Sequence, residues 1–147
     1  MNIAVFGLGY VGVVTAGCFA RDGHSIVGVD VSPGKVQEIN HGRSAILERD
    51  IPEIIAAAVA AGRLRATTDS AAALADVEMA FVCVGTPSRV DGSLDTSFLE
   101  RVLEQIGAAL RERRSAFTLV IRSTVLPGTM RRVALPILQE AAGRGRV

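Results

Sequence analysis

The chain has little of the chemistry that marks several common classes of protein. It contains no tryptophan, one tyrosine and two cysteines, and its formal net charge is +1. Two cysteines are too few for a disulfide framework, so Cys18 and Cys83 are predicted to be small buried residues in a reducing, cytoplasmic setting. A nearly neutral charge gives no indication of a nucleic-acid or lipid-surface partner. No metal site is predicted.

Apolar residues are abundant by contrast. They make up 49% of the 147 residues, and the mean hydropathy is +0.36. A chain of this length is the size of one domain and can bury an ordinary core. Such a composition is typical of a parallel sheet that is covered on both faces.

A glycine-rich turn near the amino terminus indicates the kind of ligand. The apolar run Ile3–Phe6 is followed by G-L-G-Y-V-G, which predicts a strand, a tight turn and a helix. In such a unit Gly7 permits the turn, Gly9 lets the backbone approach a diphosphate, and Gly12 lets the helix pack closely on the strand. The start of the helix then offers free amides and a positive dipole end to the phosphates.

A carboxylate at the end of the next predicted strand indicates the cofactor. Asp30 follows the run Ser25–Val29 and lies where a carboxylate can accept hydrogen bonds from an adenosine ribose. It would repel a 2′-phosphate, and the residues after it include no arginine to bind one. Lys35 is the nearest cation. The prediction is therefore NAD rather than NADP.

This segment fits two other interpretations. Residues 3–20 carry no charge, so they can be read as a membrane span or a signal sequence, and a glycine triplet alone can be a purely structural turn. No basic region precedes the segment, however, and four glycines interrupt it. The second strand and its terminal acid also follow at the expected spacing, which favours dinucleotide binding.

The rest of the chain alternates between strand and helix patterns. Strands are predicted at 64–66, 79–84 and 118–121, and helices at 33–40, 52–61, 69–75 and about 95–113, with a last helix after Thr129. This predicts a Rossmann-type, doubly wound parallel sheet in three α/β/α layers, with strand order 3-2-1-4-5-6. Residues 143–147 resemble the lead-in to a sixth strand that is missing, so residues 1–147 are expected to be the NAD-binding part of a longer enzyme.

The last two helices carry more specific predictions. In the helix that ends near residue 113, Phe98, Val102, Ile106 and Leu110 recur at intervals of four, which predicts a core face. The arginines that follow are expected to form a solvated helix end; they are Arg111, Arg113 and Arg114. Pro136 is predicted to kink or restart the last helix.

Two loops are predicted to meet the glycine turn. Ligands of a doubly wound sheet bind outside the carboxyl ends of the strands where the strand order reverses. Gly85 and Thr86 follow the fourth strand, and Thr124 follows the fifth. The hydroxyl of Thr86 is predicted to reach the ribose or nicotinamide side of the cofactor, although a simple Gly-Pro turn is the alternative.

Four motifs together resemble a known family. F-G-L-G-Y-V-G, G-V-D-V-S, F-V-C-V-G-T-P-S and I-R-S-T-V-L-P-G-T occur in the order seen in the NAD-binding domain of the UDP-glucose/GDP-mannose dehydrogenase family. A-G-C and R-S-T-V-L-P-G-T are more similar to the GDP-mannose 6-dehydrogenase branch than to the UDP-glucose branch. The chain departs from the family at residues 48–51, where E-R-D-I replaces the usual E-P-G-L.

The resemblance implies which residues contact NAD and what the enzyme does. It implies cofactor contacts at the residues that match the motifs, namely Tyr10, Val11, Asp30, Lys35, Thr86 and Thr124. It also implies oxidation of a nucleotide-sugar C6 alcohol to a carboxylate with two NAD, through an aldehyde and a cysteine-bound thioester, in a homo-oligomeric enzyme of polysaccharide biosynthesis.

The catalytic residues of the family belong to segments that come later than this sequence. Cys18 and Cys83 are not expected to be the nucleophile, and Thr124 has at most a supporting role. The chain alone is therefore expected to bind NAD without catalysis. A UDP-glucose 6-dehydrogenase domain and a stand-alone NAD-binding module are the two alternatives.

Overall fold

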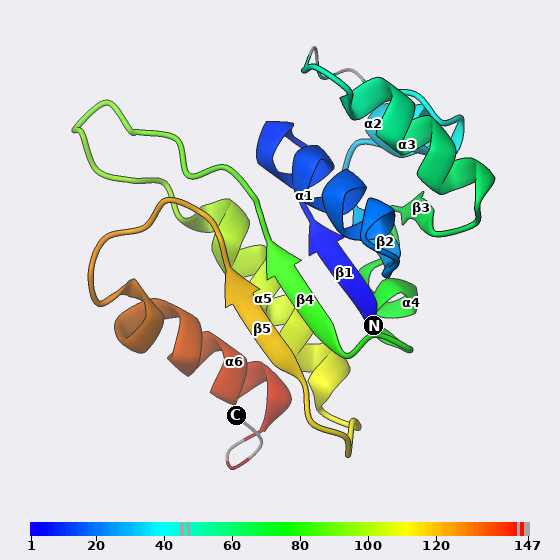
Figure 1. Cartoon of the computed structure of the whole chain (residues 1–147). Coiled ribbons are helices and arrows are strands. Elements are labelled where there is room, and N and C mark those ends of the chain that lie inside the picture. Colours follow the sequence, from blue (N-terminus) through cyan, green and yellow to red (C-terminus); the bar gives the residue numbers. More distant parts are fainter. Residues whose placement is uncertain (45, 47, 144, 146–147) are drawn as a thin grey trace.

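The strands of the computed structural model, which describes residues 1–44, 46, 48–143 and 145, form one parallel sheet (Figure 1). Its strand order is β3-β2-β1-β4-β5. The strands are β1 (Asn2–Phe6), β2 (Ser25–Val29), β3 (Leu64–Thr67), β4 (Met79–Val82) and β5 (Thr118–Ile121). This order confirms the predicted doubly wound α/β sheet. Of the stretch expected to lead into a sixth strand, residues 144, 146 and 147 lie outside the described residues.

Helices cover both faces of this sheet. They are α1 (Tyr10–Arg21), α2 (Pro33–Asn40), α3 (Ile51–Ala60), α4 (Ser70–Leu74), α5 (Ser97–Leu110), the π-helix η1 (Met130–Ala134) and α6 (Leu135–Ala142). One core cluster joins Ile3 and Val5 of β1 to α1, α2 and α3. The other joins Ala4 and Phe6 to α4, α5 and α6. Because side chains alternate along a strand, β1 supplies both cores, and three layers result.

The core face of α5 differs from the predicted one. Leu99, Leu103 and Ile106 are fully buried, whereas Phe98 is 46% exposed and Val102 is only partly buried. An α-helix has 3.6 residues per turn, so a face is followed by steps of four and then three, and strict steps of four rotate away from it. The prediction was therefore wrong at Phe98, whereas Ile106 is fully buried, and Val102 and Leu110 are partly buried against this core.

The prediction of a solvated helix end for the arginines after α5 was wrong at Arg113. Arg113 is half-buried: its Nη1 and Nη2 donate to the carbonyls of Leu74 and Val77 at 3.2 and 2.6 Å, and its guanidinium lies 5.0 Å from the centre of the Phe117 ring. Arg111 donates to the carbonyl of Ala141 at 2.9 Å. These side chains tie the end of α5 to its neighbours. Arg111 and Arg114 are nevertheless exposed, as predicted.

The last helix restarts near its proline, as predicted. The π-helix η1 runs from Met130 to Ala134, and α6 begins at Leu135 with Pro136 in its first turn. Proline has no amide hydrogen to donate, so it is tolerated at a helix start, where that hydrogen bond is not needed.

Candidate functional site

The glycine turn between β1 and α1 is closely packed at Gly7 and Gly12, as predicted. Gly7 has a φ of +90°, and a Cβ there would lie 3.0 Å from the carbonyl oxygen of Cys83. A Cβ on Gly12 would lie 1.7 Å from the carbonyl oxygen of Gly7. A Cβ on Gly9 would meet nothing within 4 Å. The turn is therefore closed on the protein side and open above Gly9.

The start of α1 faces that open space. The helix begins after Gly9, and its first hydrogen bond runs from the amide of Val13 to the carbonyl of Gly9 at 2.9 Å. The amides of Tyr10, Val11 and Gly12 precede that bond, so they have no acceptor within the helix. Free amides and the positive end of the helix dipole make this a place where an anion binds favourably.

Asp30 lies immediately after β2 and is 8% exposed. Its Oδ2 accepts from the amide of Leu8 at 2.7 Å and from Lys35 Nζ at 3.3 Å, and its Oδ1 accepts from the amide of Ser32 at 2.9 Å. A carboxylate has about four acceptor positions, so these bonds fix its orientation and leave Oδ1 able to accept one more. The structure thus brings Lys35 to Asp30 and joins both to the glycine turn.

Leu8 was missed in the sequence analysis although it joins these parts. It is 3% exposed, and a Cβ on Gly28 in β2 would lie 2.8 Å from its Cδ2. Gly28 therefore makes room for the side chain of Leu8, whose amide then reaches Asp30. The signal in the sequence was an apolar residue between two glycines of the turn, which a purely glycine-based reading overlooks.

The loops after β4 and β5 are joined by hydrogen bonds. The amide of Arg122 donates to the carbonyl of Val82 at 2.8 Å, and Ser123 Oγ donates to the carbonyl of Val84 at 2.7 Å. Thr86 Oγ1 donates to the carbonyl of Thr124 at 2.6 Å. The Thr86 hydroxyl has used its proton, so it can only accept a hydrogen bond from a ligand. Thr86 and Thr124 are therefore brought together, as predicted.

Cys83 follows β4 directly, whereas the prediction placed it inside that strand. It is 9% exposed, and this burial raises the pKa of its thiol, although the nearby Arg122 guanidinium and Thr15 hydroxyl partly oppose the shift. Both cysteines are free thiols, and Cys18 is half-buried in α1. A buried neutral thiol is a poor nucleophile, which agrees with the prediction that Cys83 has no catalytic role.

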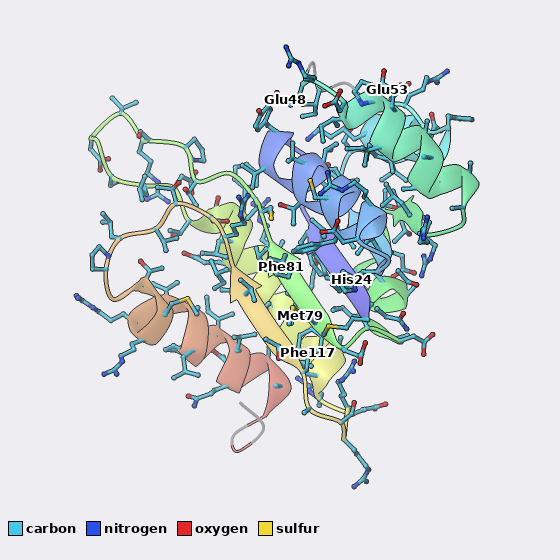
Figure 2. All side chains as sticks on the ribbon, in the orientation of Figure 1. His24, Glu48, Glu53, Met79, Phe81 and Phe117 are labelled. Carbon is cyan, nitrogen blue, oxygen red and sulfur yellow. The ribbon has the colours of Figure 1, made fainter. Side chains whose placement is uncertain are left out.

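The connection before α3 reaches the glycine turn. The phenol of Tyr10 donates a hydrogen bond to the carboxylate of Glu48, and this bond raises the pKa of Tyr10. Figure 2 places Glu48 beside the first turn of α1. Asp50 has a φ of 65°, in the left-handed region, at the position where the family pattern has glycine. The departure E-R-D-I thus keeps a backbone conformation that suits glycine, with Asp in its place.

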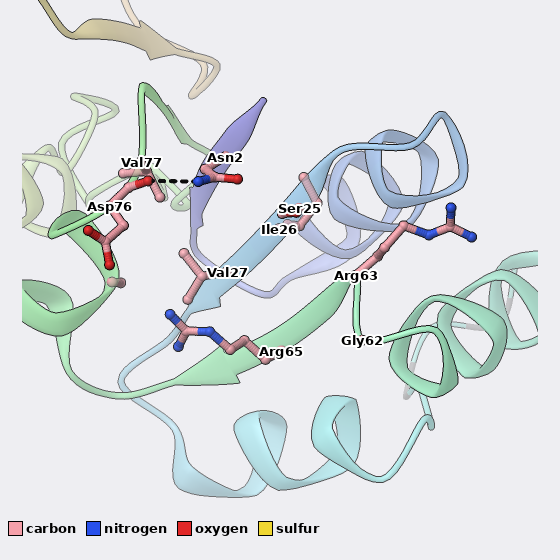
Figure 3. A pocket seen from close by; sticks show the side chains of 10 residues that line it. Asn2, Ser25, Ile26, Val27, Gly62, Arg63, Arg65, Asp76 and Val77 are labelled. Carbon is pink, nitrogen blue, oxygen red and sulfur yellow. Dashed lines mark hydrogen bonds between the residues drawn. The ribbon is translucent and has the colours of Figure 1, made fainter.

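A separate cavity of about 200 Å³ lies at the amino ends of the strands, at the opposite end of the sheet from the glycine turn (Figure 3). It is bordered by the amino ends of β2 and β3 and by Arg65 and Asp76. None of the predicted cofactor residues lines it. In the part of the chain that the structure describes, no helix has the length and hydropathy needed to cross a membrane, and no group of side chains has a metal-binding arrangement.

Comparison with known proteins identifies the family. A family model described as UDP-glucose/GDP-mannose dehydrogenase family, NAD binding domain, matches residues 1–146. This chain belongs to the UDP-glucose/GDP-mannose dehydrogenase family. Since the matched part of the family is its NAD-binding domain, the predicted fold and the predicted cofactor, NAD, are confirmed for this chain.

Individual members of the family are also similar to this chain. GDP-mannose 6-dehydrogenase of Azotobacter vinelandii is 48% identical over 144 residues, which are 98% of this chain and 33% of the relative. A solved ternary complex of GDP-mannose dehydrogenase from Pseudomonas aeruginosa has a TM-score of 0.96 at 45% identity, covering 98% of this chain and 33% of that one. A UDP-glucose dehydrogenase from Pyrobaculum islandicum has a TM-score of 0.91 at 37% identity, covering 97% and 33%. The chain spans about a third of the length of these relatives.

The geometry of this family member fits NAD. The open space above Gly9 leaves room for a diphosphate beside the amides of Tyr10 and Val11. Asp30 lies at the carboxyl end of the neighbouring strand with acceptor capacity left on Oδ1. The loops of Thr86 and Thr124 follow β4 and β5, on the other side of β1 from Asp30. These groups lie along the edge that a dinucleotide spans in such a sheet.

Proposed function

We propose that this chain is the NAD-binding part of a nucleotide-sugar 6-dehydrogenase that acts on GDP-mannose. The observation that carries this proposal is the 48% identity to a GDP-mannose 6-dehydrogenase, compared with 36% and 41% for two UDP-glucose 6-dehydrogenases. The proposed overall reaction converts GDP-mannose, water and two NAD into GDP-mannuronate and two NADH. The longer enzyme is proposed to be a cytoplasmic homo-oligomer, and the two free cysteines agree with a reducing compartment.

In this proposal the residues of the turn would hold the diphosphate of NAD, and NAD would supply the hydride acceptor for oxidation of the sugar. The amides of Tyr10, Val11 and Gly12 donate to phosphate oxygens, and Gly9 permits the close approach. The role of these residues is to fix the cofactor in one orientation, so that the hydride acceptor lies beside the sugar carbon in the longer enzyme.

Asp30 is proposed to bind the adenosine ribose of NAD, and Thr86 and Thr124 are proposed to lie near its nicotinamide end. Asp30 Oδ1 accepts from a hydroxyl of the adenosine ribose, and Lys35 lies 3.3 Å from Oδ2, where it can donate to the same ribose. Thr86 accepts a hydrogen bond from the nicotinamide side, because its proton is already donated to Thr124. Thr124 is proposed to assist substrate positioning and not to perform a chemical step.

Isothermal titration of the chain with NAD and NADP tests the cofactor part of this proposal. We expect NAD to bind more tightly, because the buried carboxylate of Asp30 repels a 2′-phosphate. Asp30→Asn keeps a hydrogen-bond acceptor and removes the charge. It should therefore reduce the difference in affinity between NAD and NADP. Tighter binding of NADP by the unaltered chain would falsify the proposed role of Asp30.

The substrate part is tested on the protein that carries this domain. Steady-state oxidation of GDP-mannose and UDP-glucose should give the higher kcat/KM for GDP-mannose. A clear preference for UDP-glucose would replace this proposal with its alternative. The 147-residue chain itself should bind NAD without oxidising either sugar, because its cysteines are a half-buried residue of α1 and a buried thiol. Turnover by this chain would contradict that expectation.

A further inference from the structure

Arg122 is the first residue after β5, and its side chain reaches across the sheet edge toward α1. Its Nη1 lies 3.5 Å from Thr15 Oγ1, a long and weak hydrogen bond. Thr15 Oγ1 in turn donates to the carbonyl of Val11 at 2.7 Å. Thr15 therefore connects the guanidinium to the first turn of α1, where the diphosphate of NAD is proposed to bind.

Within the described part of the chain, this guanidinium makes no ion pair. Among residues 1–44, 46, 48–143 and 145, the ion pairs are made by Arg21, Lys35, Arg43 and Arg89, and none involves Arg122. Its side-chain contacts are the Thr15 hydroxyl and the Cys83 thiol. A guanidinium has five N–H donors, so most of its capacity to donate hydrogen bonds is available to a ligand.

Cys83 does not supply the missing negative charge. Burial raises the pKa of its thiol, and this effect exceeds the opposing influence of Arg122. The thiol is therefore neutral near pH 7. Arg122 is exposed beside an anion-binding turn, and a guanidinium binds phosphate well through paired hydrogen bonds.

We propose that Arg122 binds the nicotinamide-side phosphate of NAD from the β5 side of the crevice, opposite the amides of α1. This inference rests on the proposed function, since it assigns a further residue to the same cofactor site. The adenosine-side phosphate lies toward Asp30 and β2, whereas Arg122 lies across β4 from β1. In this proposal the helix amides bind both phosphates, and Arg122 adds a second contact to the nicotinamide-side phosphate alone.

Binding of three adenine nucleotides tests this assignment. AMP has only the adenosine-side phosphate, ADP has a second phosphate, and NAD has the second phosphate with the nicotinamide riboside attached. We expect Arg122→Met to weaken the binding of ADP and NAD by roughly 10- to 100-fold, which is the usual loss for a hydrogen bond to a charged group. The binding of AMP should weaken by less than about two-fold. Arg122→Lys keeps the charge but not the paired donors. Its affinities for ADP and NAD should therefore lie between those of the unaltered chain and those of Arg122→Met.

Controls separate this role from a structural one. Arg101→Met removes one positive charge from an exposed position of α5 and should leave all three affinities unchanged. Thermal unfolding of each variant checks that it is folded. If Arg122→Met does not fold, the comparison is made with Arg122→Lys instead. Equal weakening of AMP, ADP and NAD, or weakening of NAD alone, would overturn the assignment to the second phosphate. If the unaltered chain fails to bind NAD, the proposed function itself is wrong.

Discussion

Gly9 provides a test in which stability and binding are expected to change in opposite directions. Its φ of −82° and ψ of −168° suit any residue, and a Cβ there would meet nothing within 4 Å. Replacing glycine by alanine at a compatible position stabilises a protein by about 0.4–1 kcal/mol, because the unfolded chain loses conformational freedom. For a domain of this size that corresponds to an increase in Tm of about 1–4 °C.

The same methyl group would occupy the space proposed for the diphosphate. Overpacking against a rigid neighbour costs about 1–3 kcal/mol. We therefore expect Gly9→Ala to weaken the binding of NAD by about 5- to 150-fold. Differential scanning fluorimetry gives the Tm and isothermal titration gives the Kd. A higher Tm together with an unchanged Kd would refute the proposed path of the cofactor over Gly9.

Two further glycines calibrate that experiment. At Gly12 a Cβ would lie 1.7 Å from the carbonyl oxygen of Gly7, so Gly12→Ala should destabilise the fold by about 3 kcal/mol or more and abolish binding as a consequence. At Gly34 a Cβ would meet only Ser32 Oγ at 3.8 Å, an ordinary contact. Gly34→Ala should stabilise α2 by up to about 1 kcal/mol and leave NAD binding intact.

Two other predictions concern the loops around the site. Asp50 has a φ of 65° and its side chain makes no capping bond, so Asp50→Gly should be more stable than Asp50→Ala by about 1 kcal/mol in urea denaturation; equal stabilities would contradict a strained backbone there. Hydrogen bonds from Ser97, and then the nearby Arg89, lower the pKa of Asp95 from 3.8 to about 2. Because the folded pKa is the lower one, the stabilisation is present above about pH 4 and is lost as the pH falls toward 2. The stability difference between the chain and Asp95→Asn should therefore shrink over that range, and a constant difference would contradict the assignment.

The sequence was sufficient to predict the parts of the fold that depend on local chemistry. A turn with a φ of +90° requires glycine at Gly7, and a Cβ on Gly12 would lie only 1.7 Å from the carbonyl oxygen of Gly7, so both glycines are visible in the sequence. Asp30 was predictable for a similar reason, because its place follows from the length of one strand, turn and helix.

Contacts between distant segments were not predictable in this way. Arg113 lies in a run of arginines that is typical of a solvated helix end, and only the folded chain brings it to the carbonyls of Leu74 and Val77. The buried face of α5 depends on the angle at which that helix packs, so a pattern that included Phe98 and one that included Leu99 were both compatible with the sequence. The reach of Arg122 to Thr15 likewise joins residues 107 positions apart.

The hydrogen bonds between the loops after β4 and β5 have a mechanical consequence. The two loops are tied at three successive points, by the amide of Arg122, Ser123 Oγ and Thr86 Oγ1. We therefore expect a ligand that orders one of these loops to order the other as well. A molecule that docks beside Thr124 should thus reduce the mobility of Thr86, although it does not contact that residue.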